Sequence, residues 1–142
     1  MPVNPYNYRN PRRDDIMVSL AGPFSNLALA LAFAVILGLF GRLLSVGVVP
    51  GGINTAIILL LQYGVMINVW LAVFNLIPIP PLDGSRILAG LLPQEAALRF
   101  LQVERYGFVI LFLLLWSGVF GRVIYPLALG LAGIFTGVRL YG

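Results

Sequence analysis

Two long stretches without a charged residue dominate the first half of the chain. They cover residues 16–41 and 53–76. At about 1.5 Å per helical residue, each is long enough to cross a hydrocarbon core of ~30 Å. Residues 1–15 before them are polar and rich in proline and asparagine, which predicts a loop or a short extended segment. The pattern therefore predicts two membrane-spanning helices behind a polar N-terminal segment.

Residues 77–105 interrupt this apolar pattern. They open with three prolines within four positions, Pro78, Pro80 and Pro81. Each proline removes a backbone donor, so a regular helix cannot continue through them. The remainder mixes charged and apolar residues, which predicts a short helix near 85–91 and then an interfacial helix that starts near Pro93. The region is thus predicted to be a Pro-rich loop followed by helices at the membrane surface.

The last apolar region, residues 106–138, is divided by Arg122 into two runs that are each short for a span. We interpret it as a helical hairpin that turns near Gly121–Pro126. Together, the pattern predicts an all-α polytopic membrane protein with about four transmembrane helices and a Pro-rich break before Asp83. The whole chain, residues 1–142, is expected to form a single membrane domain.

The composition supports membrane insertion. Apolar types make up 60% of the residues and charged types 10%, and the mean hydropathy is +0.97. Soluble domains have about 45–50% apolar and about 25% charged residues, which excludes an ordinary cytosolic enzyme. Cysteine and histidine are both absent. The chain therefore has no disulfide, no thiol nucleophile and no imidazole base.

The positive charge comes from nine arginines and no lysine, and the formal net charge is +4. The arginines lie between apolar runs rather than along one stripe, so we expect contact with anionic lipid of the bilayer and no nucleic acid. A cytoplasmic N-terminus places seven of them inside and two outside, which predicts that both termini are cytoplasmic. The seven are Arg9, Arg12, Arg13, Arg86, Arg99, Arg105 and Arg139, and the two are Arg42 and Arg122.

A small-residue motif lies in the first apolar run. Gly22 and Asn26 are four residues apart and therefore share one helix face. Glycine allows a neighbouring backbone to approach, and an asparagine within lipid needs a polar partner. Pro23 lies between them and predicts a kink, because it frees the carbonyl group of Ser19. From the residues alone, helix packing is the preferred interpretation of this motif.

The segment from Asn75 to Gly84 carries a second motif, which ends in Leu-Asp-Gly. In one interpretation it is a Pro-rich turn in which Asp83 caps the next short helix. In the other, non-helical backbone at membrane depth lines a wet or protein-enclosed site, and Asp83 is a functional carboxylate. The residues alone leave these two interpretations about equal.

These segments resemble the site-2 protease family of intramembrane zinc metalloproteases, and most closely its short bacterial members. The resemblance covers essentially the whole chain and rests on PVNPYNYRNPRRDD, SLAGPFSN, NVWLAVFNLIPIPPLDGSRIL and ERYGF, in family order. It implies that Asp83 is a zinc ligand and that Asn75 lies beside the catalytic centre as a donor to the substrate carbonyl group or oxyanion. It also implies that Gly22 and Asn26 pack helices near the site. The implied location is a bacterial cell membrane, and the implied partner is a transmembrane protein substrate.

The sequence departs from the family in one respect. Family members hold zinc with two histidines of a His-Glu-x-x-His helix and one aspartate, and the glutamate activates water. Here no such helix is present, and catalytic zinc normally takes three protein ligands. We therefore expect the C-terminal part of a protease that is inactive alone, with a separate segment supplying His-Glu-x-x-His. The alternatives are a non-catalytic membrane scaffold that binds transmembrane partners and, with thinner support, a small transporter or channel subunit.

Overall fold

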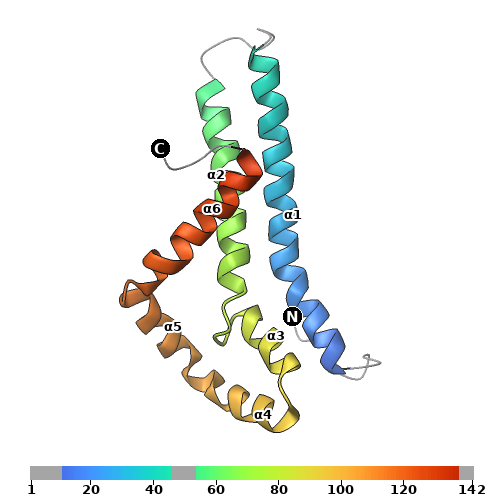
Figure 1. Cartoon of the computed structure of the whole chain (residues 1–142), viewed down its shortest axis with the longest axis vertical. Coiled ribbons are helices and arrows are strands. Elements are labelled where there is room, and N and C mark those ends of the chain that lie inside the picture. Colours follow the sequence, from blue (N-terminus) through green and yellow to red (C-terminus); the bar gives the residue numbers. More distant parts are fainter. Residues whose placement is uncertain (1–10, 46–53, 138–142) are drawn as a thin grey trace.

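The structure is a computed structural model, and it describes residues 11–45 and 54–137. The described elements are all helical, which confirms the predicted all-α class (Figure 1). In chain order they are α1 (Pro11–Ser45), α2 (Asn54–Asn75), α3 (Asp83–Leu91), α4 (Gln94–Gln102), the 3-10 helix η2 (Val103–Tyr106), α5 (Gly107–Trp116), the π-helix η3 (Phe120–Ile124) and α6 (Tyr125–Thr136).

Helices α1 and α2 are long and apolar enough to cross a membrane, so the chain is an integral membrane protein. α1 begins at Pro11, earlier than the expected residue 16. Proline is favourable at the start of a helix, where its missing donor has no partner to lose, and Asp14 suits the positive end of the helix dipole. Pro23 lies inside α1, and the helix continues through it. The kink expected there stays a prediction.

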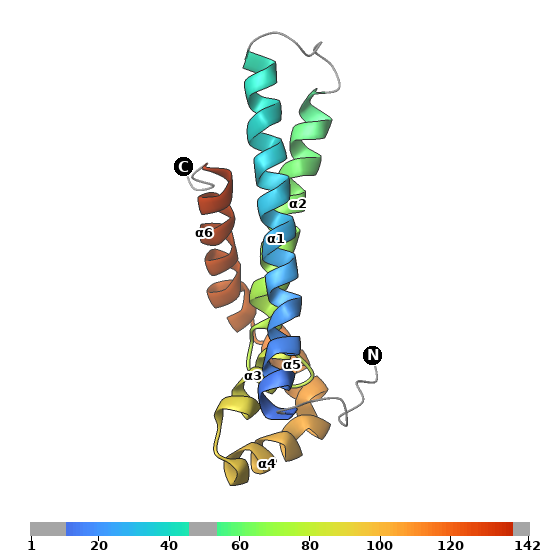
Figure 2. The same ribbon diagram turned by 90° about the vertical axis from the view of Figure 1, so that its right-hand side faces the viewer.

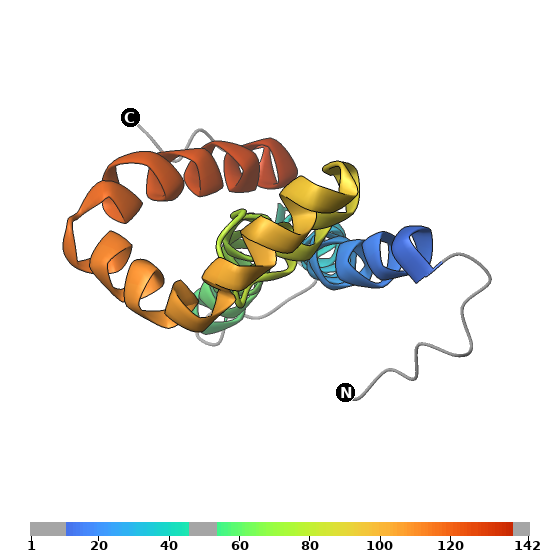
Figure 3. The same ribbon diagram turned by 90° about the horizontal axis from the view of Figure 1, so that it is seen from below.

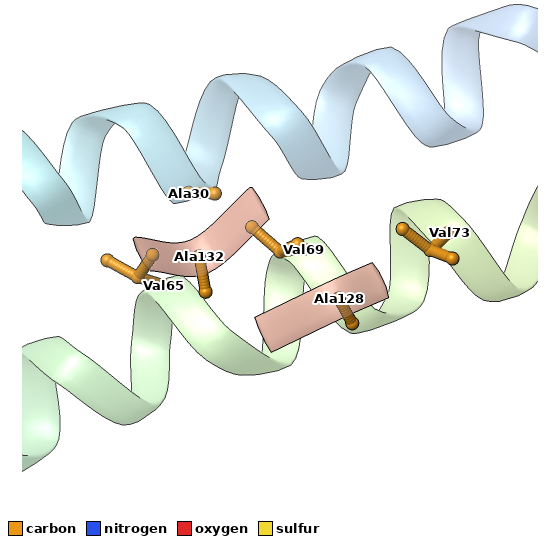
Figure 4. Packing of buried hydrophobic residues seen from close by; sticks show 6 residues of the cluster. All are labelled: Ala30, Val65, Val69, Val73, Ala128 and Ala132. Carbon is orange, nitrogen blue, oxygen red and sulfur yellow. The ribbon is translucent and has the colours of Figure 1, made fainter. Parts of the chain in front are cut away.

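The core forms where α1, α2 and α6 meet, and it consists of small side chains (Figure 4). Small residues allow membrane helices to approach closely. At one level the approach is so close that a Cβ atom on Gly64 of α2 would lie 2.7 Å from the ring of Phe33 on α1. Large apolar side chains instead cover the outer faces, where lipid would contact them. The buried cluster is Ala30, Val65, Val69, Val73, Ala128 and Ala132.

The last third of the chain differs from the expected hairpin. α5 has 10 residues and α6 has 12, and at about 1.5 Å per residue each is too short to cross a ~30 Å core. The helical segments on either side of residues 117–119 meet at a bend of 70° and count as at most one span. The described residues therefore hold two candidate spans, or up to three, rather than about four.

The turn of this bend lies earlier than the expected Gly121–Pro126. Gly118 has φ +73°, a left-handed conformation that glycine adopts without strain. Pro126 lies in the first turn of α6, where proline is tolerated. Figures 1 and 2 place the bend near the level of the α2–α3 connection, away from the end where α1 and α2 are joined. The outer position expected for this bend and for Arg122 stays a prediction.

Short helices follow the Pro-rich break. α3 and α4 lie where the sequence predicts a short helix and a second helix after Pro93. Both are amphipathic, and α4 buries none of its residues. They gather at the end of the molecule that holds the first turns of α1 (Figure 2). This end is the one that carries the candidate site.

Candidate functional site

The Pro-rich break folds back on the end of α2. The backbone N–H of Ile79 donates to the carbonyl of Ile77 at 2.8 Å, and that of Leu82 donates to the carbonyl of Ile79 at 2.9 Å. The turn brings α3 so close that a Cβ atom on Gly84 would overlap the backbone of Leu76. Only a residue without a side chain fits there. The position of Asp83, the neighbour of Gly84, is thus tied to the end of α2.

Asp83 lies against α1. It is half-buried at the first position of α3, and a Cβ atom on Gly22 would lie 2.8 Å from its Oδ2 atom. The N-terminal end of a helix favours a negative charge. The cap residue of α3 is Leu82, and no side chain of the described residues hydrogen-bonds the cap. The interpretation of Asp83 as a capping residue is therefore wrong, and its carboxylate is available for another contact.

Two further contacts hold α3 antiparallel to α1. Arg86 Nη1 lies 3.4 Å from Asp15 Oδ1, and Ile16 of α1 packs on Gly90 so closely that a Cβ atom there would overlap it. The ion pair is exposed, and such pairs contribute about 0–1 kcal/mol. Close packing of α3 on α1 is therefore the larger constraint. The sequence pattern does not predict this pairing, because Asp15 and Arg86 are 71 residues apart and carry no motif.

The two candidate asparagines lie on the helices around this carboxylate. Asn75 is the last residue of α2 and is half-buried, on the other side of the Pro-rich break from Asp83. Asn26 is half-buried on α1, one turn beyond Gly22. Within the described part of the chain, no side-chain hydrogen bond joins either asparagine to Asp83. The structure thus brings Gly22 and Asp83 into contact, and among the described residues it shows no hydrogen bond from either asparagine to Asp83.

The chain's own residues do not fit a catalytic zinc ion. Such an ion takes three protein ligands, and among residues 11–45 and 54–137 no group of three His, Cys, Asp or Glu side chains could hold a metal. The sequence has no histidine or cysteine at all. Asp83 could supply one ligand, and any further ligand would have to come from other polypeptide.

Comparison with known proteins identifies relatives of this chain. The model of Peptidase family M50 matches residues 43–117, which include α2, the Pro-rich break and Asp83. The chain is 32% identical over 130 residues to "Putative zinc metalloprotease YwhC" of Bacillus subtilis, covering 89% of this chain and 57% of that protein. It is 38% identical over 71 residues to "Putative zinc metalloprotease MJ0611" of Methanocaldococcus jannaschii, covering 50% and 31%. No solved structure matches.

The chain thus spans little more than half of YwhC and about a third of MJ0611. The family match itself extends over more than half of this chain and contains both Asn75 and Asp83. On this evidence the chain belongs to peptidase family M50, the site-2 protease family.

Proposed function

We propose that this chain is the C-terminal part of an intramembrane zinc metalloendopeptidase that hydrolyses peptide bonds of membrane-embedded proteins. The observation that carries the proposal is the family match over residues 43–117. In this proposal Asp83 is one metal ligand, and a polypeptide segment outside these 142 residues supplies two histidines and a glutamate. In the complete enzyme the metal would polarise the scissile carbonyl group and acidify its bound water.

The position of Asp83 supports its proposed role. A carboxylate beside membrane-spanning helices is costly and is therefore a functional candidate. Here the carboxylate is tied on one side to the end of α2 through Gly84 and on the other to α1 through Gly22. It is thus held in one place without a hydrogen bond that would occupy its oxygens within the described residues. Such a position suits a metal ligand whose partner ligands come from another helix.

The backbone of the break is the proposed contact for substrate. Three prolines leave this segment without a helical hydrogen-bond ladder. Non-helical backbone near a membrane span is tolerated where it lines a protein-enclosed site. In the proposal an unwound substrate pairs with residues 77–82 as an added strand, and Asn75 donates to its carbonyl group.

The alternative function is a non-catalytic membrane scaffold that binds transmembrane partners. It is favoured by the lack of histidine in the sequence and by the lack of a three-residue metal group in the described structure. The two functions differ in one respect that can be measured: only the protease requires Asp83 once the missing ligands are supplied.

The experiment is to supply those ligands. We would co-express the chain with a membrane segment that contains His-Glu-x-x-His, or fuse the two, and measure cleavage of a transmembrane reporter. Asp83→Asn keeps the shape of the side chain but removes its charge, so cleavage should fall by orders of magnitude while membrane insertion is retained. Asn75→Ala should lower the rate by about 10²–10³ if it provides one donor to developing charge.

Glu95→Gln is the matched control, because Glu95 is an exposed carboxylate of α4. Asp15→Asn is a poorer control, since Asp15 pairs with Arg86 on α3. Full activity of Asp83→Asn would remove the ligand assignment. Failure of the reconstituted wild-type protein to cleave, with both segments inserted and associated, would favour the scaffold.

We also propose the location and orientation that the sequence suggests, a bacterial cell membrane with both termini cytoplasmic. Two spans and a re-entrant bent pair satisfy this orientation, because an even number of crossings returns the chain to its starting side. A bent pair that crosses as one span does not. The described arginines at the α3 end support a cytoplasmic position of that end, whereas Arg9 and Arg139 lie outside the described residues.

A further inference from the structure

A cleft opens at the polar end of α1, on the side of α3 that faces α4. Its volume is about 460 Å³, which is in the range of small-molecule sites. Arg12 and Asp15 of α1 line it on one side and α4 lines it on the other, and Gly90 of α3 is also part of the lining. Figure 3 shows α4 crossing this end of the molecule beside the first turns of α1. We call this space the α1–α4 cleft.

The α4 wall is one amphipathic face. Gln94, Leu98 and Leu101 line the cleft and are spaced at i, i+4 and i+7, so they share a helix face. Glu95 and Arg99 lie outside this lining. Although it lines a cleft, the apolar face is not covered by the described protein: Leu98 is 58% exposed, and α4 has no buried residue. The face therefore suits an apolar ligand that enters from the membrane.

The α1 wall is charged, and its balance is positive. Asp15 lines the cleft, but Arg86 lies 3.4 Å from its carboxylate and offsets its charge. Arg12 then gives the rim a net positive charge. A guanidinium group binds a phosphate through directed hydrogen bonds. The cleft thus places a phosphate-binding side chain across from an apolar helix face.

The charged and apolar sides of the cleft match the phosphate headgroup and the acyl chains of a phospholipid. Arg12 lies in the first turn of α1, just before the charge-free run that crosses the membrane. Arginine near a span end lies at the level of lipid headgroups. Figures 1 and 2 place α4 at this same end of the molecule, and its apolar face with Leu98 and Leu101 lines the cleft across from Arg12. A soluble anion would satisfy Arg12 but would leave the α4 face uncovered.

We propose that the α1–α4 cleft binds one anionic glycerophospholipid, with its phosphate at Arg12 and its acyl chains along Leu98 and Leu101. The site is independent of the proposed protease activity, because it uses neither Asp83 nor Asn75. It fixes a lipid at the junction of α1, α3 and α4, where α3 contacts both of the other helices.

The test is a lipid titration of the purified 142-residue chain in detergent, followed by native mass spectrometry. Phosphatidylglycerol, phosphatidylcholine and inorganic phosphate are the three probes. Phosphatidylglycerol should bind at least fivefold more tightly than phosphatidylcholine. Arg12→Gln should weaken phosphatidylglycerol binding about fivefold, the value expected for one arginine near a membrane surface. Leu98→Asn should weaken both lipids, and this exposed position should tolerate the change without unfolding.

Two matched controls separate a site from general attraction. Arg42→Gln removes an exposed arginine at the other end of α1, and Arg99→Gln removes one from α4 outside the cleft lining. Both should bind phosphatidylglycerol as the wild type does. Equal losses in Arg12→Gln and Arg42→Gln would show diffuse attraction and overturn the site. Displacement of the lipid by millimolar inorganic phosphate would show a free-anion site, which would also overturn the proposal.

Discussion

The region around Asp83 and the arm formed by α5, η3 and α6 differ in what surrounds their glycines. At Gly22, Gly84 and Gly90 an added Cβ atom would meet another element at once. At Gly121 and Gly130 of the arm it would meet nothing within 4 Å. With the exception of Gly107 at the start of α5, glycine therefore marks close contacts in one region and open space in the other.

The side chains show the same contrast. α5 buries only Gly107, which lies against the carbonyl of Pro80 at the Pro-rich break, and Trp116 at its other end is 81% exposed. Apart from that anchor, α5 has its main contacts with the neighbouring segments η2 and η3. The Asp83 region is thus set by protein packing, whereas the arm is set largely by its own bend and by the contacts of α6 with α2.

The largest expected effect concerns the topology of the arm in the membrane, which tests the contrast between the packed Asp83 region and the loosely packed arm. Reporter fusions at Gly142 and within residues 42–52 should give opposite locations, with Gly142 cytoplasmic. The reason is the arginine bias, which places both termini inside: α1 and α2 already return the chain to its starting side, so the bent pair must re-enter rather than cross. The result is all-or-none, since each reporter is active on one side only. The same location for both fusions would mean that the bent pair crosses the membrane once.

The next largest effect should come from Gly84. Gly84→Ala places a Cβ atom into the backbone of Leu76, and backbone cannot rotate away as a side chain does. Overpacking of this kind costs about 1–3 kcal/mol, measured as a lower midpoint of thermal unfolding in detergent. Gly130→Ala in α6 is the matched control. It should be neutral or stabilising by up to about 1 kcal/mol, because alanine favours helix over glycine. Equal destabilisation of both variants would refute the contrast.

The part of the fold that follows from local sequence was predictable. Charge-free runs located α1 and α2, and three prolines located the break before Asp83, because length, charge and missing donors act within a segment. The bend at Gly118 was not predictable. Its cause is the backbone conformation of Gly118, one of 16 glycines in the chain. The sequences on either side of it are equally apolar, so no local pattern marks this glycine as the bend.

For the candidate site, too, the sequence predicted individual residues but not the contacts between them. The sequence singled out Asp83 and Gly22 as separate motifs, and only the family resemblance suggested that they lie near one another. No spacing rule connects residues on α1 with residues on α3. For the same reason the pairing of Asp15 with Arg86 was missed, and Asp15 was predicted only as the end of the polar N-terminal segment, residues 1–15. Contacts between residues far apart in the sequence can be found only from the packed structure, whereas the type of each element can be predicted from the local sequence.

The smallest expected effect on stability, and the most informative for the site, is that of Gly22→Ala. The added Cβ atom would lie 2.8 Å from Asp83 Oδ2, the end of a side chain that can rotate. The fold should therefore keep its stability or gain up to about 1 kcal/mol from helix propensity, while the carboxylate is displaced. In the reconstituted protease a misplacement of about 1 Å can cost about 10²-fold in rate. Gly38→Ala, on the same helix with nothing within 4 Å, should gain the same stability and keep full activity. A Gly22→Ala variant that cleaves as fast as Gly38→Ala would show that contact with α1 does not set the position of the carboxylate, even if Asp83 itself proves essential.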